Sequence, residues 1–494
     1  MGIISTEEAK RIIERGASAS IPFGTIINHE IQVTQASKEW RWMCKGDDYY
    51  LGRHDILQKK RTAIGEGGKL VQVNNLPNNR QIDNVYKRMV QQKTNYLFGK
   101  PFTVQSDNAT YQNLLTQIFD KQFMKLLKNV AKDSLNCGLG WLYLYYGEDG
   151  TLQFERMKPY ELIPLWNDSE HTSLEGAIRF YDIINYNGQT EQRIRKVEYY
   201  TLNGIDYYQY YNGSLLIAPP YHTDYITAAD GKTYNWDRIP LIPFKYNDEE
   251  IPLIVNCKSL QDGLNQLISA FSDNMEEDTR NTILILKNYD GENLGEFRRN
   301  LATYGAVKVR TIDGADGGVD ALQIDVNSEN YKTIIQMLKK AIVENCMGYD
   351  VKDEAIGGTP NQMNIQSMYN DIDLDASDME TEYQAAMDNL LDFVDIYLKN
   401  AGLGDFTREQ VEITFNTNMP MDESTTIQNI QNSVGILSTE TLVAHHPWVT
   451  DADAEIEKLD AEKQKNMEDY GLAFQKNPSG DGNGEGDDPQ DGDE

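Results

Sequence analysis

The sequence predicts an α+β, multidomain fold in which long helices accompany a separate β-rich region. The chain has 494 residues, which is too long for one ordinary hydrophobic core and indicates two or more domains. Residues 141–250 contain short Tyr, Ile and Val runs separated by Asn-Gly pairs, a pattern typical of antiparallel hairpins. Residues 258–280 and 327–347 show helical spacing of apolar residues and enclose a shorter segment with strand-like runs. A small α/β unit is therefore expected between two helices.

The first 140 residues are predicted to be mainly helical. A short helix is expected over 6–15, followed by a looser stretch that contains Trp40 and Trp42. A second helix is expected over 81–96, where apolar positions recur at helical spacing, and a third over about 110–137. Gly99 and Pro101 end the second of these helices, and Gly138 and Gly140 end the third.

The β-rich region starts with a strand over 141–146 and continues through five shorter runs. These are residues 152–156, 177–185, 196–202, 207–211 and 214–217. Turns are expected at Asn187-Gly188, Asn203-Gly204 and Asn212-Gly213, because Asn-Gly pairs favour tight hairpin turns.

The insert between the two central helices is predicted to hold strands over 282–286, 306–310 and 321–325 and a helix over 293–304. A glycine- and asparagine-rich loop, 355–362, follows the second central helix and leads into a long carboxylate-rich helix that ends at Ala401-Gly402. A strand over 411–415 comes next, then a helical region over 424–470. The last eighteen residues hold seven acids, five glycines and no base, so a disordered tail is expected.

Charge is distributed unevenly along the chain. The net charge is −31, yet residues 51–140 contain 14 Lys/Arg and 6 Asp/Glu, whereas residues 348–494 contain 7 Lys/Arg and 33 Asp/Glu. Affinity for duplex DNA depends on neutralising phosphates with cations. A chain this acidic is expected to repel DNA over most of its surface and, if it meets DNA at all, to let it pass and not to hold it.

No motif for catalysis, metal binding or membrane insertion stands out. The four cysteines are scattered without a neighbouring histidine, which argues against a zinc site and a disulfide framework. Residues 65–69 fail the phosphate-loop pattern, because Leu70 stands where a hydroxyl residue is required. No run of eighteen apolar residues predicts a membrane span. We therefore expect no enzymatic activity, no cofactor and no bound metal.

The acids Asp371, Asp373 and Asp375 resemble the start of a calcium-binding EF-hand loop, with Glu382 at its twelfth position. The sixth position requires glycine and is Ala376. The acids are instead expected to form a solvated helix face or to repel a like-charged ligand.

Several segments, in order, make the chain resemble the portal (head–tail connector) proteins of tailed bacteriophages, in the subgroup common in siphophages. These segments are Tyr50-Leu51-Gly52-Arg53-His54-Asp55, Asn95-Tyr96-Leu97-Phe98-Gly99-Lys100-Pro101, Phe271-Ser272-Asp273-Asn274-Met275, Ile356-Gly357-Gly358, Val411-Glu412-Ile413-Thr414-Phe415-Asn416 and Gly435-Ile436-Leu437-Ser438. The ordered set covers roughly residues 50–465.

The resemblance implies a portal fold and a ring of about twelve subunits around a channel for double-stranded DNA at one capsid vertex. It assigns 1–257 and 363–417 to the wing, 258–281 and 327–347 to stem helices, 282–326 to the clip, 348–362 to the tunnel loop, 418–470 to the crown and 471–494 to a disordered acidic tail.

In the expected tunnel loop, Gly357 and Gly358 permit backbone rearrangement. Neutral, exchangeable hydrogen bonds to phosphates are expected from Asn361, Gln362 and Asn364, and repulsion from acids that include Asp353 and Glu354. The loop is thus expected to act as a compliant gasket around moving DNA.

In the clip, Arg298, Arg299 and Arg310 are candidates for docking a partner, with a solvated helix face as the alternative. The implied partners are the terminase large subunit, the head-completion adaptor, and the major capsid and scaffolding proteins, with assembly in the host cytoplasm and no membrane. Two other functions stay open from the residues alone, a virion-associated hydrolase and a capsid adaptor that forms no channel. The role of the basic 51–140 block also stays open.

Overall fold

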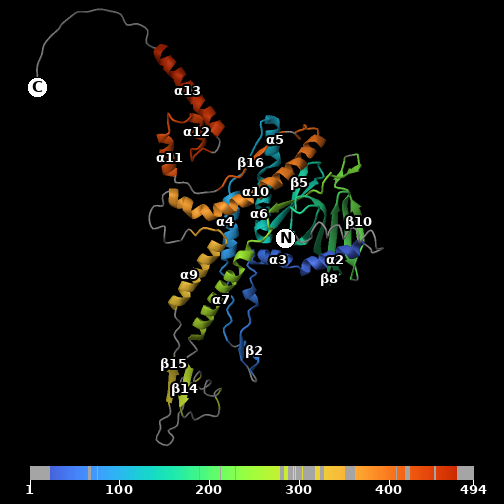
Figure 1. Cartoon of the computed structure of the whole chain (residues 1–494), viewed down its shortest axis with the longest axis vertical. Coiled ribbons are helices and arrows are strands. Elements are labelled where there is room, and N and C mark those ends of the chain that lie inside the picture. Colours follow the sequence, from blue (N-terminus) through green and yellow to red (C-terminus); the bar gives the residue numbers. More distant parts are fainter. Residues whose placement is uncertain are drawn as a thin grey trace, which may run out of the picture. The chain divides into compact units, whose positions relative to one another are not determined.

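A computed structural model of the chain (Figure 1) describes residues 23–64, 68–74, 76–188, 190–211, 213–228, 230–278, 283–287, 293, 295, 303, 318–322, 328–350, 362–407, 409–417, 423–449 and 452–475. Backbone contacts divide the chain into two compact units, Met1–Asp353 with Met368–Asn418 and Glu354–Ser367 with Met419–Glu494. Among the described residues, no helix combines the length and the apolar character needed to cross a membrane.

The β-rich region of the first unit forms two antiparallel sheets. In the smaller sheet, β4 (Leu139–Tyr146) lies between β13 (Leu241–Lys245) and β5 (Leu152–Met157). The larger sheet has the order β10-β9-β8-β7-β6, with strands β6 Leu162–Trp166, β7 Leu174–Asn187, β8 Thr190–Thr201, β9 Gly204–Tyr211 and β10 Ser214–Thr223. The indole rings of Trp141 in β4 and Trp166 in β6 stack with centroids 5.8 Å apart, so the two sheets share one core.

The predicted hairpins are confirmed. Tyr211 pairs with Ser214, so the third turn falls between them, as expected for Asn212-Gly213. Asn187 pairs with Thr190, so the first turn falls between these two residues, one residue later than predicted. Thr201 pairs with Gly204, so the second turn lies at Leu202 and Asn203, one residue earlier than predicted.

The looser stretch predicted around Trp40 and Trp42 is wrong, because two helices occupy it. Helix α2 covers Phe23–Ala36 and α3 covers Lys38–Tyr50. Ser37 caps α3, since its Oγ accepts a hydrogen bond from the Trp40 amide at 3.1 Å. Ile27 and Ile31 of α2 are buried against the five-stranded sheet.

The single helix predicted over 110–137 is also wrong, because two helices stand in its place. They are α5 (Ala109–Ile118) and α6 (Lys121–Cys137). The Asp120 carboxylate between them accepts from the amides of Gln122 and Phe123 at 2.8 Å each, so it caps the start of α6.

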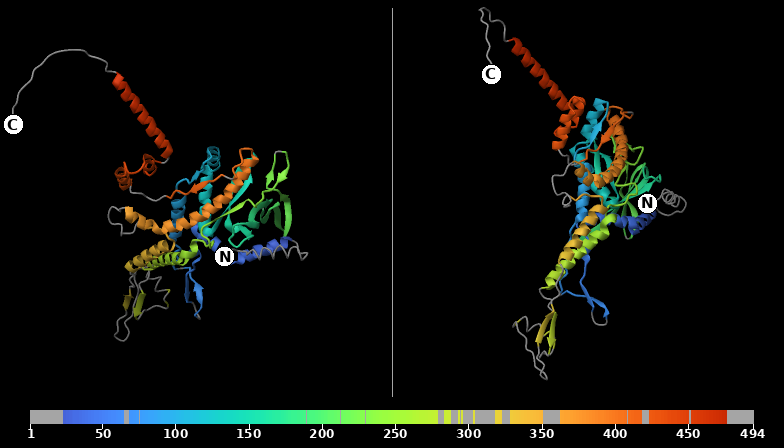
Figure 2. Two further views of the ribbon diagram at one scale, coloured as in Figure 1. Left: turned by 45° about the horizontal axis from the view of Figure 1, so that its top comes forward. Right: turned by 60° about the vertical axis from the view of Figure 1, so that its left-hand side comes forward.

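The predicted central helices are confirmed as α7 (Ile254–Asp278) and α9 (Ser328–Asn345), which lie side by side (Figure 2). Between them in sequence, β14 (Ile283–Lys287) pairs antiparallel with β15 (Gly318–Leu322), three residues ahead of the strand predicted over 321–325. Most of the helix predicted over 293–304, and the whole strand predicted over 306–310, lie outside the described residues, as do the 6–15 helix and the tail.

The remaining elements of the first unit frame these parts. The long helix is confirmed as α10 (Gln362–Asn400), and the strand predicted over 411–415 as β16 (Glu412–Thr414), which pairs with β3 (Thr103–Gln105). Helix α4 covers Val85–Phe98 and starts four residues later than predicted. Short elements complete the unit: η1 Asp55–Gln58, β1 Thr62–Ile64, β2 Leu70–Gln72, η3 Pro159–Glu161, β11 Ile226–Thr227 and β12 Thr233–Tyr234.

The second unit is helical within its described residues, as predicted for 424–470. Its helices are α11 (Glu423–Asn432), α12 (Thr439–Ala444) and α13 (Ala452–Gln475). Ser438 caps α12 by accepting from the Thr441 amide at 3.2 Å.

Candidate functional site: the α7–α9 hairpin and its seat

Helices α7 and α9 form an antiparallel hairpin. Near the end of α7, the Phe271 and Tyr331 rings lie 5.0 Å apart, and Asn274 Nδ2 donates to the Tyr331 hydroxyl at 3.1 Å. At the opposite end, a hydrogen bond with the Cys346 thiol, together with burial, raises the pKa of the Cys257 thiol well above its ordinary value. Contacts at both ends therefore hold the two helices together along their length.

One face of α7 carries four polar residues spaced four apart, Gln261, Asn265, Ser269 and Asp273, here called the polar ladder. All four are fully buried. Residues four apart are neighbours on a helix surface, so the ladder forms one continuous stripe that is inclined to the helix axis. Buried polar groups need hydrogen-bond partners, so another segment of the protein must supply donors and acceptors along this stripe.

An extended segment, residues 79–83, provides those partners. The amides of Asn79, Gln81 and Asp83 donate to Asp273 Oδ1, Ser269 Oγ and Asn265 Oδ1 at 2.6, 2.9 and 3.1 Å. Two extended residues advance about 6.6 Å and four helical residues about 6 Å, so the two repeats keep in step. This pairing explains the late start of α4, because the amides of 81 and 83 are bound to α7 and the chain there is not helical.

The last step of the ladder is charged. The buried Asp273 carboxylate accepts from Lys59 Nζ at 2.7 Å and from Asn79 Nδ2 at 3.0 Å. Burial alone raises the pKa of Asp273, but the hydrogen bonds from Lys59 and Asn79 outweigh it and hold that pKa below its ordinary value. Asp273 is therefore ionised at neutral pH.

His54 joins the ladder to the preceding loop. Its Nε2 lies 3.0 Å from the Tyr49 carbonyl oxygen and its Nδ1 lies 2.8 Å from Asn265 Nδ2. The carbonyl accepts and the amide donates, so the ring carries its proton on Nε2 and accepts at Nδ1. Burial lowers the pKa of His54, which keeps this neutral tautomer at neutral pH.

A second charged cluster fixes the start of α7. Lys258 Nζ donates to Asp55 Oδ2 at 2.8 Å and to Asp262 Oδ2 at 2.6 Å. Burial alone lowers the pKa of Lys258, but these two bonds raise it above its ordinary value. Although burial alone raises the pKa of Asp55, Lys258 and Lys45 hold it at about 2. The α7 helix is thus held at both ends and along its middle.

Both flanks of the expected tunnel loop rest on α4. After α9, Gln92 Nε2 donates to the Tyr349 carbonyl at 2.9 Å. The Tyr349 ring lies 4.3 Å from that of Tyr369 in α10, which in turn lies 6.2 Å from the ring of Tyr96 in α4. Tyr349, before residues 351–361, and Tyr369, after them, are therefore both linked to α4.

The carboxylates that resemble an EF-hand are used inside the fold. Asp373 accepts from the Tyr96 hydroxyl at 2.6 Å, and Asp375 accepts from buried Lys93 at 2.5 Å and from the Tyr246 hydroxyl at 2.6 Å. The predicted helix is confirmed. The predicted solvated face is wrong for Asp375, which is half-buried against Lys93, whereas Asp373 is exposed as expected. In the described part of the chain, no three His, Cys, Asp or Glu side chains are arranged to hold a metal ion.

The predicted site residues fall largely beyond this geometry. Gln362 and Asn364 lie in the first turn of α10. Outside the described residues lie Asp353, Glu354, Gly357, Gly358, Asn361, Arg298, Arg299 and Arg310. The polar ladder was missed, although its four-residue spacing within an apolar helix pattern is visible in the sequence.

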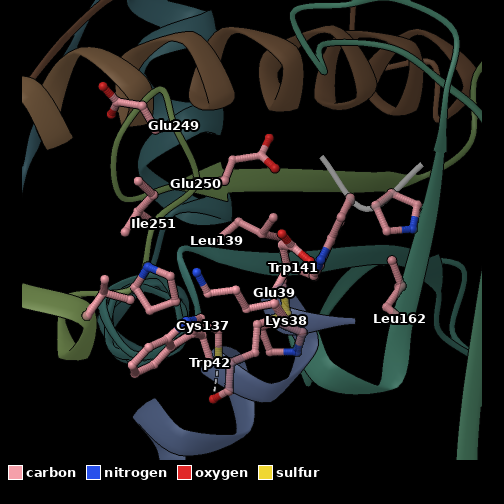
Figure 3. Close-up of a pocket in the computed structure, with 15 residues that line it drawn as sticks. Lys38, Glu39, Trp42, Cys137, Leu139, Trp141, Leu162, Glu249, Glu250 and Ile251 are labelled. Carbon is pink, nitrogen blue, oxygen red and sulfur yellow. Dashed lines mark hydrogen bonds between the residues drawn. The ribbon is translucent and has the colours of Figure 1, made fainter. Parts of the chain in front are cut away.

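A pocket of about 240 Å³ lies elsewhere in the first unit, among α3, β4 and residues 249–252 (Figure 3). Its wall is mainly apolar, with Trp42, Trp141 and Ile251 among the lining residues, and also includes Lys38 and Glu39. Burial raises the pKa of the Cys137 thiol well above its ordinary value, so this cysteine is not a thiolate nucleophile at neutral pH. The Glu250 carboxylate at the rim contacts His171 at 2.7 Å.

Comparisons of the sequence with known proteins agree on one family. The family model described as "Phage portal protein, SPP1 Gp6-like" matches residues 37–469. The portal protein of Bacillus phage SPP1 is 29% identical over an alignment of 505 positions that covers 100% of this chain and 97% of that protein. The portal protein of Clostridium phage phiCD119 is 28% identical over 434 positions, covering 84% of this chain and 91% of that protein. Among solved structures, a chain from the neck of a native GTA particle matches with a TM-score of 0.37 and 13% identity, covering 74% of this chain and 89% of that one.

Proposed function

The chain belongs to the family of SPP1 Gp6-like phage portal proteins, and we propose that about twelve copies of it close into a ring around a channel for double-stranded DNA. The portal family is structural, so DNA packaging and ejection need no catalysis by this chain. ATP hydrolysis during packaging belongs, in this proposal, to the terminase partner.

The α7–α9 hairpin carries the proposal most directly. A DNA conduit needs a wall element that keeps its shape while a charged polymer moves past it. Within the hairpin, Phe271 of α7 packs against Tyr331 of α9. On another face of α7, the polar ladder is fully buried. We assign α7 and α9 to the stem, and β14 and β15 between them to the clip.

The tunnel loop is proposed to lie over residues 348–362, between flanks that rest on α4. Gly357 and Gly358 give its backbone freedom, and Asp353 and Glu354 repel phosphates. Asn361, Gln362 and Asn364 offer neutral hydrogen bonds. A lysine-lined loop would hold DNA through counterion release, so a neutral to acidic loop suits a gasket.

The loop proposal is tested with Gly357→Pro and Gly358→Pro particles. Proline fixes φ and removes an amide donor, so packaging or retention of DNA is expected to fall. Particles that package and retain DNA normally contradict the gasket role, and Gly402→Pro, at a glycine with φ +71 just after α10, tests whether any proline near α10 has the same effect.

Docking of partners is proposed for the clip, through Arg298, Arg299 and Arg310. The partners are the terminase large subunit during packaging and the head-completion adaptor afterwards, with the ring at one capsid vertex and assembly in the host cytoplasm. Replacement of each arginine by glutamate is expected to weaken binding of the terminase large subunit to the isolated ring. Unchanged binding would favour the alternative, in which these residues lie on a solvated helix face.

The ring itself is tested by native mass measurement and negative-stain imaging of the full chain. About twelve copies of a 56.3 kDa chain with a visible central hole are expected. A stable monomer under assembly conditions contradicts the channel and favours a capsid adaptor that forms no channel.

A further inference from the structure

The C-terminal helical unit, α11 to α13 over residues 423–475, has no hydrophobic core within its described residues. No described side chain of this unit is buried, whereas the first unit buries a continuous cluster of apolar residues. Helix α11 has 10 residues and α12 has 6. Isolated helices shorter than about 12–15 residues are marginal in water, because most helical stability comes from packing an apolar face.

Large apolar side chains stand exposed in the two loops that flank α12. The exposed fractions are 68% for Val434, 79% for Ile436 and 51% for Leu437 before α12, and 71% for Trp448 after it. Trp448 is the one exposed tryptophan of the six in the chain. Exposed apolar side chains gathered over so short a stretch indicate an interaction surface.

This surface is also free of charge to an unusual degree. Residues 424–450 contain one Asp, Glu, Lys or Arg, namely Glu440, although these residues make up 25% of the whole chain. Copies of a chain with net charge −31 repel one another at a distance. A contact between such copies is favourable where both surfaces are neutral and apolar, which describes this segment.

We propose that residues 424–450 acquire their core from neighbouring copies of this chain, so that the C-terminal helical unit becomes stably folded when the ring closes. The proposal rests on the proposed ring. The loops around Ile436 and Trp448 supply the apolar anchors, and a neighbouring copy covers them. The unit is then a coupled folding and assembly element, in which the ordering of the helices opposes association and burial of the loops favours it.

The test compares monomer and ring fractions of the full-length protein, separated by size exclusion. Amide hydrogen exchange over 424–450 is expected to slow at least tenfold in the ring. Acrylamide quenching of Trp448, taken as the difference between the natural protein and Trp448→Phe, is expected to be strong in the monomer and to fall severalfold in the ring. Trp141, Trp166 and Trp236 are buried and Trp40 and Trp42 are half-buried, and their shared signal cancels in this difference, which therefore reports on Trp448.

Matched variants separate the surface from general effects of polarity. Ile436→Ser with Leu437→Ser is expected to raise the chain concentration for half-maximal ring formation at least tenfold. Leu202→Ser is the control, because Leu202 is 51% exposed, like Leu437, but lies in the β8–β9 turn. It is expected to change that concentration less than twofold.

Three outcomes overturn the inference. Protection of 424–450 already in the monomer shows that the unit folds on its own chain. Fast exchange in a well-formed ring shows that neighbouring copies do not cover it, while the ring and the proposed function stand. Absence of any ring overturns the proposed function and this inference with it.

Discussion

Replacement of Asp273 by alanine tests whether the polar ladder holds α7 to the rest of the first unit. The carboxylate accepts from the Asn79 amide at 2.6 Å and from Lys59 Nζ at 2.7 Å, at a fully buried position. A buried donor that loses its acceptor costs about 1–3 kcal/mol. Three hydrogen bonds to the carboxylate are lost, from the Asn79 amide, Asn79 Nδ2 and Lys59 Nζ. Asn79 Nδ2 also donates to Glu276 and Lys59 Nζ to the Asn79 carbonyl, so the Asn79 amide is the donor left without an acceptor. Since the Lys59 side chain is 21% exposed, water replaces part of its lost bond. The expected total is about 2–4 kcal/mol.

Hydrogen exchange of the peptide 76–84 gives the local free energy of opening at this place. A loss of about 2–4 kcal/mol corresponds to exchange faster by about 30- to 900-fold. Asp273→Asn keeps an acceptor for Asn79 and is expected to cost less than half as much. Ser272→Ala, one residue away and at a more exposed hydrogen bond, is the control.

The effect of Asp273→Ala is also expected to depend on pH in a definite direction. The pKa of Asp273 is depressed in the folded chain, so its contribution is complete above the unfolded value of about 3.9. The contribution is lost as pH falls through the folded pKa. The difference between the natural protein and Asp273→Ala must therefore shrink in acid. Exchange within threefold of the natural protein at neutral pH, or a difference that grows in acid, refutes the ladder as the anchor.

Three further changes probe the first unit. Lys93→Ala leaves the Asp375 carboxylate without its buried cation and is expected to lower the free energy of unfolding, measured with urea, by about 3–5 kcal/mol. The double variant Lys93→Met with Asp375→Leu is expected to recover most of this loss. An unchanged stability of Lys93→Ala contradicts a stabilising role of the ion pair. The pKa of His54 is depressed, so its contribution to folding stability is complete above about pH 6.5 and is lost as pH falls through the folded pKa. Between pH 8 and pH 5, the melting temperature of His54→Phe is therefore expected to fall less than that of the natural protein. Equal falls in melting temperature contradict this. Asp120→Ala removes the α6 cap and is expected to cost about 1 kcal/mol, seen as faster exchange of the first α6 amides, with Asp120→Asn near neutral; equal exchange in both variants contradicts the cap.

Local patterns were sufficient to predict much of the fold. The turn between Tyr211 and Ser214, the helices α7, α9 and α10 and the strand β16 each follow from signals within a few residues. Prediction was wrong where a polar side chain acts as a cap inside a helix-favouring stretch. Asp120 reads as a solvated helix residue in sequence, but its carboxylate binds the two amides that begin α6.

The candidate site was harder to predict because its interactions are long-range. Asn79 and Asp273 are far apart in sequence, and only the matched repeats of an extended segment and a helix bring them together. Asp375 was interpreted as part of a solvated face, because Lys93, which binds its carboxylate, lies on another helix. Charge counts describe such residues as a block, whereas their contacts decide whether they face water.

The buried contacts of the first unit determine which segments of the proposed channel can move. The polar ladder spans thirteen residues of α7, from Gln261 to Asp273, or about 18 Å of helix, so a shift of this helix breaks several buried hydrogen bonds together. The chain on both sides of 351–361 is held to α4 by Tyr349 and Tyr369. We therefore propose that movement following the DNA takes place between those two tyrosines, in the segment that contains Gly357 and Gly358.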